Sequence, residues 1–247
     1  MLQEKSGGNQ NERQLDVKTV GIVGGIGPES TIEYYRQILA CYREVNPDGP
    51  APSIVINSID VKKVLGLVAD KELAQLTEYL TAEVQRLASA GADFAVLAAN
   101  TPHIVFDEVQ QRSSIPMISI VKATCDAVKA QGVKRVGLFG TRFTMQAGFY
   151  QSVFAKTGIT LVLPGEKDQA YIHEKYVNEL LNNIFSTETR SELLAIVDRL
   201  IESEHIDGVV LGGTELPLLL RNSVHRGIQL IDTTRTHVWA VIAELIA

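Results

Sequence analysis

Residues 20–24 read Val-Gly-Ile-Val-Gly, and the pattern returns at residues 136–140 as Val-Gly-Leu-Phe-Gly. A second stretch, Asp-Phe-Ala-Val-Leu-Ala-Ala-Asn-Thr at 93–101, returns at 207–215 as Asp-Gly-Val-Val-Leu-Gly-Gly-Thr-Glu. The order is kept, and the spacing between the copies is nearly the same for both pairs. Each stretch contains a short apolar run, which is typical of a buried strand in a parallel sheet. These stretches therefore predict a duplicated α/β unit, with two similar lobes that face each other across a cleft.

Apolar strands and helical patterns alternate through the rest of the chain, which favours mostly parallel sheets covered by helices on both faces. The clearest helix spans residues 71–90, where apolar side chains share one face: Leu73, Leu76, Leu80, Val84 and Leu87. Further helices are expected at 30–45, 121–131, 144–157, 170–185, 188–203 and 236–246, and further strands at 53–56, 117–120, 160–163 and 228–231. Because such sheets bind ligands at the carboxyl ends of their strands, the site is expected in the loops there.

The composition is that of a folded protein, because 45% of the 247 residues are apolar and 21% are charged. The net charge of −6 argues against a nucleic-acid partner and against a basic membrane-binding face. The sequence shows no membrane span, no secretory signal and, with two cysteines, no disulfide framework. We therefore expect a cytoplasmic protein without a membrane partner. Residues 1–16, rich in Gln, Asn, Gly and charge, are predicted to be a disordered tail.

The first candidate site loop is Gly-Gly-Ile-Gly-Pro-Glu-Ser-Thr at residues 24–31. Its glycines permit close approach of a ligand, and a helix that begins at its proline would present its N-terminus to an anion. The loop is not a Walker A motif, because no Gly-Lys-Ser/Thr follows. It is not a dinucleotide fingerprint, because Ser30 stands where a third glycine is required. The loop is either a plain turn or a ligand loop, in which Gly25 and Ile26 are the candidate binding residues.

The loop at 98–103 reads Ala-Ala-Asn-Thr-Pro-His and follows the third predicted strand. Asn100 and Thr101 offer hydrogen-bond donors and acceptors, and a helix cap would use the same residue types. His103 is either an acid or base near neutral pH or a structural histidine.

Two counterparts of these loops are expected in the second lobe. The stretch 212–217 reads Gly-Gly-Thr-Glu-Leu-Pro, where Thr214 would orient a ligand, and Glu215 would act as a base, orient a ligand amine or cap a helix. The stretch 141–145 reads Thr-Arg-Phe-Thr-Met, where Thr141 and Thr144 would bind a carboxylate or cap a helix.

These four loops, taken in order, resemble those of the aspartate/glutamate racemase family, and the resemblance runs from residue 18 to residue 247. It implies two pseudo-symmetric Rossmann-like α/β lobes, the last strand and helix returning to the first lobe. The predicted boundaries are 17–117 plus 227–247 for the first lobe and 118–226 for the second. The resemblance also implies cofactor-independent racemisation of aspartate or glutamate, so we expect no cofactor, a small acidic amino acid as ligand, and a homodimer.

Two positions depart from the family's pattern. The resemblance implies a cysteine in each lobe, one thiolate removing the α-proton and the opposite thiol returning a proton to the other face. Here the two positions are Ala99 and Gly213, which carry no proton, and Cys41 and Cys125 lie in predicted helices away from strand ends. The chain is therefore predicted to bind a small acidic amino acid and to racemise it poorly or not at all.

Several alternatives stay open from the sequence. The chain is a non-catalytic amino-acid or dicarboxylate binding or sensing protein, or it transfers protons through His103 and Glu215, or its cysteines were replaced deliberately. An enzyme of the wider superfamily, such as a decarboxylase or a cis–trans isomerase, is favoured less. Such enzymes resemble racemases in generally using at least one active-site cysteine, and neither cysteine is present at positions 99 and 213.

Two more residues are candidates for the cleft. By resemblance Lys175 would bind the ligand's distal carboxylate, unless it belongs to a solvated helix face. Asn57 ends the second predicted strand and would line the cleft. The histidines are scattered and lack the spacing of zinc motifs, so no metal site is expected.

Overall fold

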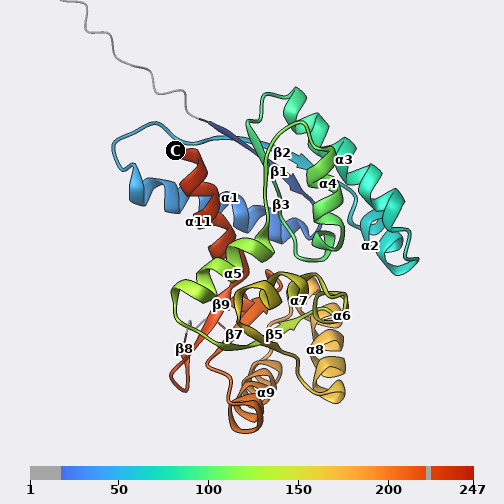
Figure 1. Ribbon diagram of the computed structural model, residues 1–247, viewed down its shortest axis with the longest axis vertical. Coiled ribbons are helices and arrows are strands. Elements are labelled where there is room, and N and C mark those ends of the chain that lie inside the picture. Colours follow the sequence, from blue (N-terminus) through green and yellow to red (C-terminus); the bar gives the residue numbers. More distant parts are fainter. Residues whose placement is uncertain (1–17, 221–223) are drawn as a thin grey trace, which may run out of the picture.

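The computed structural model describes residues 18–220 and 224–247, which form two lobes, each built on its own sheet (Figure 1). The mixed α/β class and the mostly parallel sheets that the sequence predicted are confirmed. The tail predicted for residues 1–16 lies outside the described residues.

The first sheet is built around β1 (Thr19–Gly24), whose successive side chains point to alternate faces. It pairs in parallel with β2 (Ser53–Ser58) and β3 (Phe94–Leu97), and β3 pairs with β4 (Met117–Ile118), which gives the order β2-β1-β3-β4. Val20 and Ile22 are fully buried on one face, under α1 (Pro28–Val45) and α11 (Thr233–Leu245). The helices on the other face are α2 (Val61–Ala69), α3 (Leu73–Ser89) and α4 (Phe106–Arg112).

The second sheet has the order β6-β5-β7-β9-β8. Its strands are β5 (Arg135–Gly140), β6 (Thr160–Val162), β7 (Gly208–Gly212), β8 (Val224–His225) and β9 (Ile228–Asp232), of which only the edge strand β8 pairs antiparallel. Its helices are α5 (Ile120–Ala130), α6 (Arg142–Gln146), α7 (Phe149–Phe154), α8 (Glu166–Asn178), α9 (Thr187–Glu204) and α10 (Leu216–Leu220). Short 3-10 turns lie at Thr101–Val105, Ala155–Thr157 and Leu180–Asn182.

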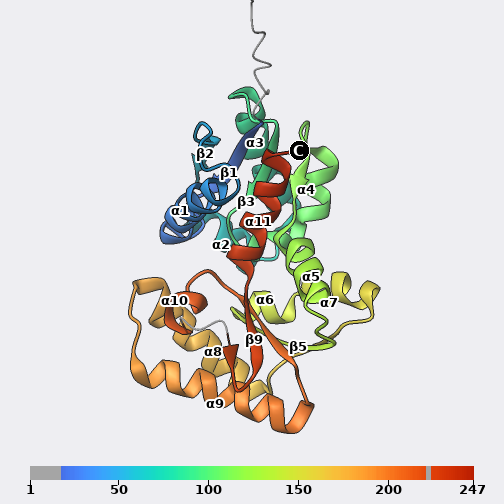
Figure 2. The same cartoon turned by 90° about the vertical axis from the view of Figure 1, so that its left-hand side faces the viewer.

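The prediction that the last strand returns to the first lobe was wrong, and the last strand and the last helix pack against different sheets. β9 pairs with β7 and so extends the second sheet, whereas α11 packs its apolar side chains into the core beneath β1. Figure 2 shows α11 leaving the second lobe at β9 and running up against the first. The chain therefore passes from the second sheet toward the first at Asp232, where β9 ends and α11 begins. The side chains of α5 belong to the core of the second lobe, and α5 also contacts α11 directly.

Some helices differ from the sequence prediction. The helix predicted over 144–157 is broken into α6 and α7, because Gly148 has a φ of 83°, which ends one helix before the next begins. α2 and α4 were not predicted; α2 begins at an Asp60 cap that accepts a hydrogen bond from the Lys62 amide at 2.8 Å. In the described part of the chain, no helix is both long and apolar enough to cross a membrane.

Candidate functional site

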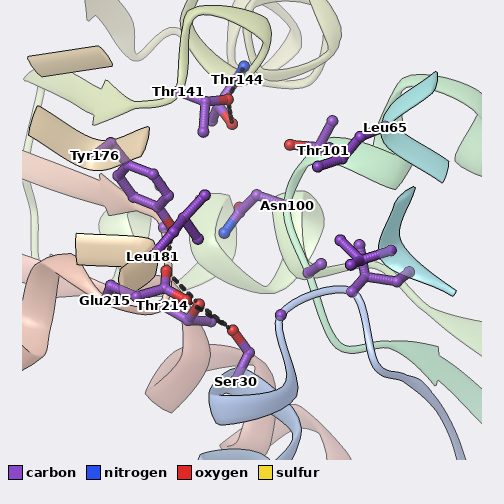
Figure 3. A pocket seen from close by; sticks show the side chains of 16 residues that line it. Ser30, Leu65, Asn100, Thr101, Thr141, Thr144, Tyr176, Leu181, Thr214 and Glu215 are labelled. Atoms are coloured by element: carbon purple, nitrogen blue, oxygen red, sulfur yellow. Dashed lines mark hydrogen bonds between the residues drawn. The ribbon is translucent and has the colours of Figure 1, made fainter. Parts of the chain in front are cut away.

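A pocket lies where the carboxyl ends of the two sheets meet (Figure 3). Its volume is about 90 Å³, which suits a small ligand. Its lining comes mainly from the four equivalent loops after β1, β3, β5 and β7, with α2 and α8 adding to the walls. The lining residues are Ile26, Gly27, Ser30, Val61, Leu65, Ala99, Asn100, Thr101, Thr141, Thr144, Tyr176, Leu181, Gly212, Gly213, Thr214 and Glu215.

Glu215 is the acidic residue of this lining, and only 4% of it is exposed. Its Oε2 accepts hydrogen bonds from the Tyr176 hydroxyl and from Thr214 Oγ1, the latter at 2.8 Å. Its Oε1 accepts from Ser30 Oγ at 3.2 Å, and the Ser30 and Thr214 hydroxyl oxygens lie close together, so two hydroxyl protons are shared among three contacts. Donors from both lobes thus hold one carboxylate, which is the usual way to keep a buried charge satisfied.

Tyr176 keeps its proton in this cluster. Burial, and then the neighbouring Glu215 carboxylate, raise the pKa of Tyr176 well above its usual value. The phenol is therefore a hydrogen-bond donor toward Glu215. Tyr176 was not singled out from the sequence, because Ile172 and Tyr176 at helical spacing read as an ordinary core-facing stripe. Ser30 was inside a predicted loop but was not chosen either.

Asn100 and Thr101 line the pocket from the first lobe. Asn100 is 95% buried, and two hydrogen bonds fix its orientation: Oδ1 accepts from the Tyr150 hydroxyl of the second lobe at 2.6 Å, and Nδ2 donates at 3.2 Å to Thr233 Oγ1, at the start of α11. Thr233 in turn donates to the Leu211 carbonyl at 2.9 Å. This chain of bonds ties the two lobes together behind the pocket.

The glycine loop after β1 contributes residues to the pocket lining. Gly25 has a φ of 81°, and a Cβ there would meet the Ile59 backbone, 2.7 Å from its nitrogen, so only glycine fits. Gly25 itself does not line the pocket, whereas Ile26 and Gly27 do. The loop is thus a tight turn that also places lining residues.

Thr141 and Thr144 line the pocket, and Thr141 also caps α6. Its Oγ1 accepts from the Thr144 amide at 3.2 Å and lies 3.1 Å from Thr144 Oγ1. The two predicted roles, helix cap and lining residue, are therefore compatible for the same side chain.

Ala99 and Gly213, the two positions singled out for their lack of a thiol, both line the pocket, one from each lobe. Ala99 is 7% exposed. Cys41 and Cys125 are buried in α1 and α5, and neither belongs to the lining.

His103 is not brought into the pocket, in contrast to its predicted acid–base role. Its Nε2 accepts from the Ile120 amide at 3.1 Å, so its Nδ1 carries the proton and donates to the Ala99 carbonyl at 2.9 Å. The ring stacks on Phe106 and is 4% exposed. Burial, with a smaller effect of His237, lowers the pKa of His103 to about 3. With both nitrogens engaged and no charge at neutral pH, this is a structural histidine.

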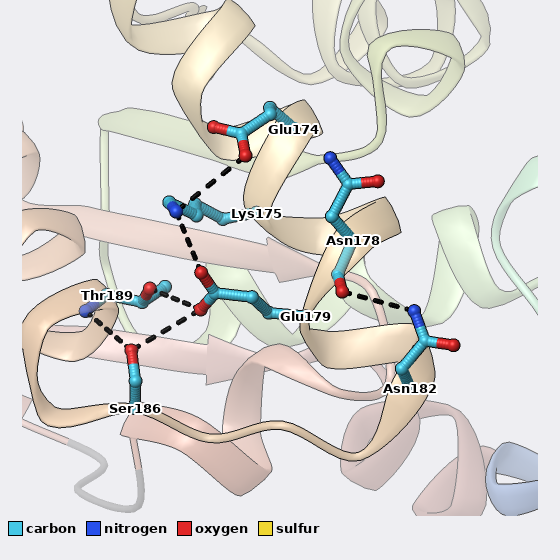
Figure 4. Close-up of polar contacts among 7 residues, drawn as sticks. All are labelled: Glu174, Lys175, Asn178, Glu179, Asn182, Ser186 and Thr189. Atoms are coloured by element: carbon cyan, nitrogen blue, oxygen red, sulfur yellow. Dashed lines mark hydrogen bonds and ion pairs between the residues drawn. The ribbon is translucent and has the colours of Figure 1, made fainter.

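Asn57 and Lys175 lie outside the lining as well. Asn57 Nδ2 donates to Glu83 Oε2 at 2.8 Å, so it holds β2 against α3. Lys175 forms an ion pair of 2.7 Å with Glu179, and Thr189 and Ser186 donate to the same carboxylate (Figure 4). Hydrogen bonding to Lys175, and then to Thr189, lowers the pKa of Glu179. Lys175 is thus paired with Glu179 outside the pocket lining.

Residues 18–220 and 224–247 contain no group of three His, Cys, Asp or Glu side chains placed to hold a metal ion. The arrangement offers neutral hydroxyls, an amide and backbone groups around one carboxylate.

Two α/β lobes with a small pocket between the strand ends define a class of two-lobed α/β proteins. Within this class, the sequence profile described as Asp/Glu/Hydantoin racemase matches residues 23–241, so the chain belongs to that family.

Relatives agree with this assignment over nearly the whole chain. The broad specificity amino-acid racemase RacX of Bacillus subtilis is 25% identical over 233 residues, which are 92% of this chain and 98% of RacX. The structure of PH1733, an aspartate racemase homologue from Pyrococcus horikoshii OT3, matches with a TM-score of 0.80 and 31% identity, covering 93% of this chain and all of that one. A Yersinia pestis protein assigned as an Asp/Glu racemase matches with a TM-score of 0.84 and 29% identity, over the same shares.

Proposed function

We propose that the pocket binds a small acidic amino acid, aspartate or glutamate, and that the chain racemises it slowly or not at all. The observation that carries this proposal is the pair Ala99 and Gly213, which line the pocket from opposite lobes and carry no ionisable group. Membership of a racemase family supports an amino acid as the ligand.

The lining supplies partners for each part of such a ligand. The Glu215 carboxylate would accept from the α-ammonium group, since a carboxylate has more acceptor sites than its internal donors use. The carboxylates of the ligand would meet the hydroxyls of Thr141 and Thr144 and the backbone around Gly27. Asn100 would orient the ligand from the first lobe.

Inversion at the α-carbon needs a proton acceptor on one side and a donor on the other. The ionisable groups of the lining are Tyr176 and Glu215, and both come from the second lobe. Each positioned acid or base contributes typically about 10²–10⁴-fold to a rate, so their absence on one face predicts slow racemisation.

Deuterium uptake tests the proposal. Purified protein is incubated with L-aspartate and then L-glutamate in D₂O, loss of the α-proton is followed by NMR, and the enantiomers are analysed chirally, with heat-inactivated protein as control. We expect binding by calorimetry with little exchange and little D-isomer. Rapid formation of the D-isomer would contradict the impaired activity, and absence of any binding would contradict the ligand.

The same experiment distinguishes the second candidate, a non-catalytic binding or sensing protein, which predicts binding without any exchange. Its support is that the four lining loops surround one pocket although the lining lacks a thiol.

The homodimer stays a prediction, and light scattering on the purified protein tests it.

A further inference from the structure

Tyr176 stands in the space that a side chain at position 213 would need. A Cβ built on Gly213 would lie 2.5 Å from the Tyr176 hydroxyl oxygen and 2.7 Å from its Cζ, closer than real Cβ atoms come to other heavy atoms. The φ of Gly213 is not among the positive values of the chain, so its backbone admits a side chain. The tyrosine ring, therefore, keeps this position free of one.

The Tyr176 hydroxyl also fixes the direction of the Glu215 carboxylate. The phenol and Thr214 both donate to Oε2, and among residues 18–220 and 224–247 Ser30 is the one donor to Oε1. Tyr176 is 5% exposed and Glu215 is 4% exposed, so neither side chain is free to swing into solvent. Oε1 is thus the carboxylate oxygen with capacity left for a ligand donor.

We propose that Tyr176 is a specificity-determining residue of this pocket: its ring limits the space at the second-lobe wall, and its hydroxyl orients Glu215 toward a ligand's amino group. The inference rests on the proposed function and names the amino group as the part of the ligand that this wall recognises. It favours short α-amino acids over longer ones, and α-amino acids over dicarboxylic acids of the same length that lack the amino group.

The claim about space is tested without any ligand. Gly213→Ala is made in the natural chain and in a Tyr176→Ala chain, and thermal unfolding is recorded for all four proteins. We expect Gly213→Ala to lower the melting temperature by several degrees in the natural chain and by less than half as much once the ring is gone. The matched control is Tyr171→Ala, a tyrosine of the same helix outside the lining, in which the full effect of Gly213→Ala is retained. Equal effects in all three backgrounds would overturn the claim.

The claim about recognition is tested by calorimetry with aspartate, glutamate and succinate, which is aspartate without its amino group. The natural chain is expected to bind aspartate about tenfold or more tighter than succinate, and Tyr176→Phe to reduce this preference to about threefold or less. Tyr176→Ala is expected to shift the aspartate-to-glutamate preference toward glutamate by about threefold or more. Tyr171→Phe leaves both preferences unchanged.

The outcomes separate this inference from the proposed function. Binding with preferences that both Tyr176 variants leave unchanged refutes the recognition role and leaves the proposed function intact. No binding of any of the three acids, together with the expected coupling between positions 213 and 176, refutes the proposed function and, with it, the recognition role, while the claim about space stands.

Discussion

Gly25 adopts a φ of 81° in the turn after β1, and a Cβ there would also collide with the Ile59 backbone. Gly132 has a similar φ of 74° but has open space around it. We expect Gly132→Ala to lower the free energy of unfolding by about 1 kcal/mol, from the backbone conformation alone. Gly25→Ala is expected to lower it by clearly more, about 2–4 kcal/mol, because strain and overlap act together. Urea unfolding of both variants measures the difference, and equal losses would show that the turn relaxes freely.

Positions 99 and 213 carry a second prediction at the scale of the residue. If the lack of thiols limits racemisation, Ala99→Cys with Gly213→Cys restores it only when Tyr176 is also reduced to Ala, because its ring fills the space at 213. We expect the triple variant to form D-aspartate from L-aspartate at least about 100-fold faster than the natural chain. The double variant is expected to stay slow. Chiral analysis measures both. A folded triple variant without activity would contradict the prediction that the missing thiols limit racemisation.

At the scale of the element, α11 links the two lobes, and its start depends on one side chain. Asp232 Oδ1 accepts from the amides of Thr234 at 2.8 Å and Arg235 at 3.2 Å. Asp232→Ala is expected to lower the free energy of unfolding by about 1–2 kcal/mol, whereas Asp232→Asn keeps the cap and loses much less. Denaturant titration of both variants checks this. Equal losses of unfolding free energy in Asp232→Ala and Asp232→Asn would contradict this prediction, because the charge would then contribute more than the cap.

The helices and strands also show which elements the sequence pattern predicted and which it missed. The repeat and the apolar periodicity predicted both sheets, the principal helices and the four lining loops. They missed α2 and α4, which are only 9 and 7 residues long, and they merged α6 with α7 across Gly148. Short elements of this kind are held by tertiary packing more than by their own propensity.

At the scale of the whole molecule, two buried histidines lie near the junction of the lobes. His237 accepts from the Tyr34 hydroxyl at 2.8 Å and donates to the Ile118 carbonyl at 2.9 Å, and its ring centre is 6.2 Å from that of His103. Burial lowers the pKa of His237 to about 4, as it lowers that of His103 to about 3. Both rings are therefore neutral in the folded protein at neutral pH.

These shifts predict how stability depends on pH. Both pKa values are lower in the folded chain than the usual 6.5 of the unfolded chain, so below pH 6.5 the unfolded chain binds more protons. Stability is therefore full above pH 6.5 and falls as the pH drops from 6.5 toward 4, by a few kcal/mol in order of magnitude. Urea unfolding between pH 8 and pH 5, with NMR of the imidazole protons, measures both effects. His205→Asn, at an exposed position, is the control and is expected to leave the slope unchanged. Imidazole signals of His103 or His237 that titrate near pH 6.5 would contradict the prediction.

The sequence by itself determined the α/β class, the duplicated unit, the family and the strand ends where the pocket forms. It could do so because strand burial, helical periodicity and loop motifs are properties of neighbouring residues. Tertiary structure alone decided that β9 joins the second sheet, that His103 is engaged away from the pocket, and that Asn57 and Lys175 pair with glutamates elsewhere. It also brought Tyr176 against Gly213 and Glu215, residues that come from different elements. Such contacts depend on how distant segments pack, and no local pattern in the chain encodes them.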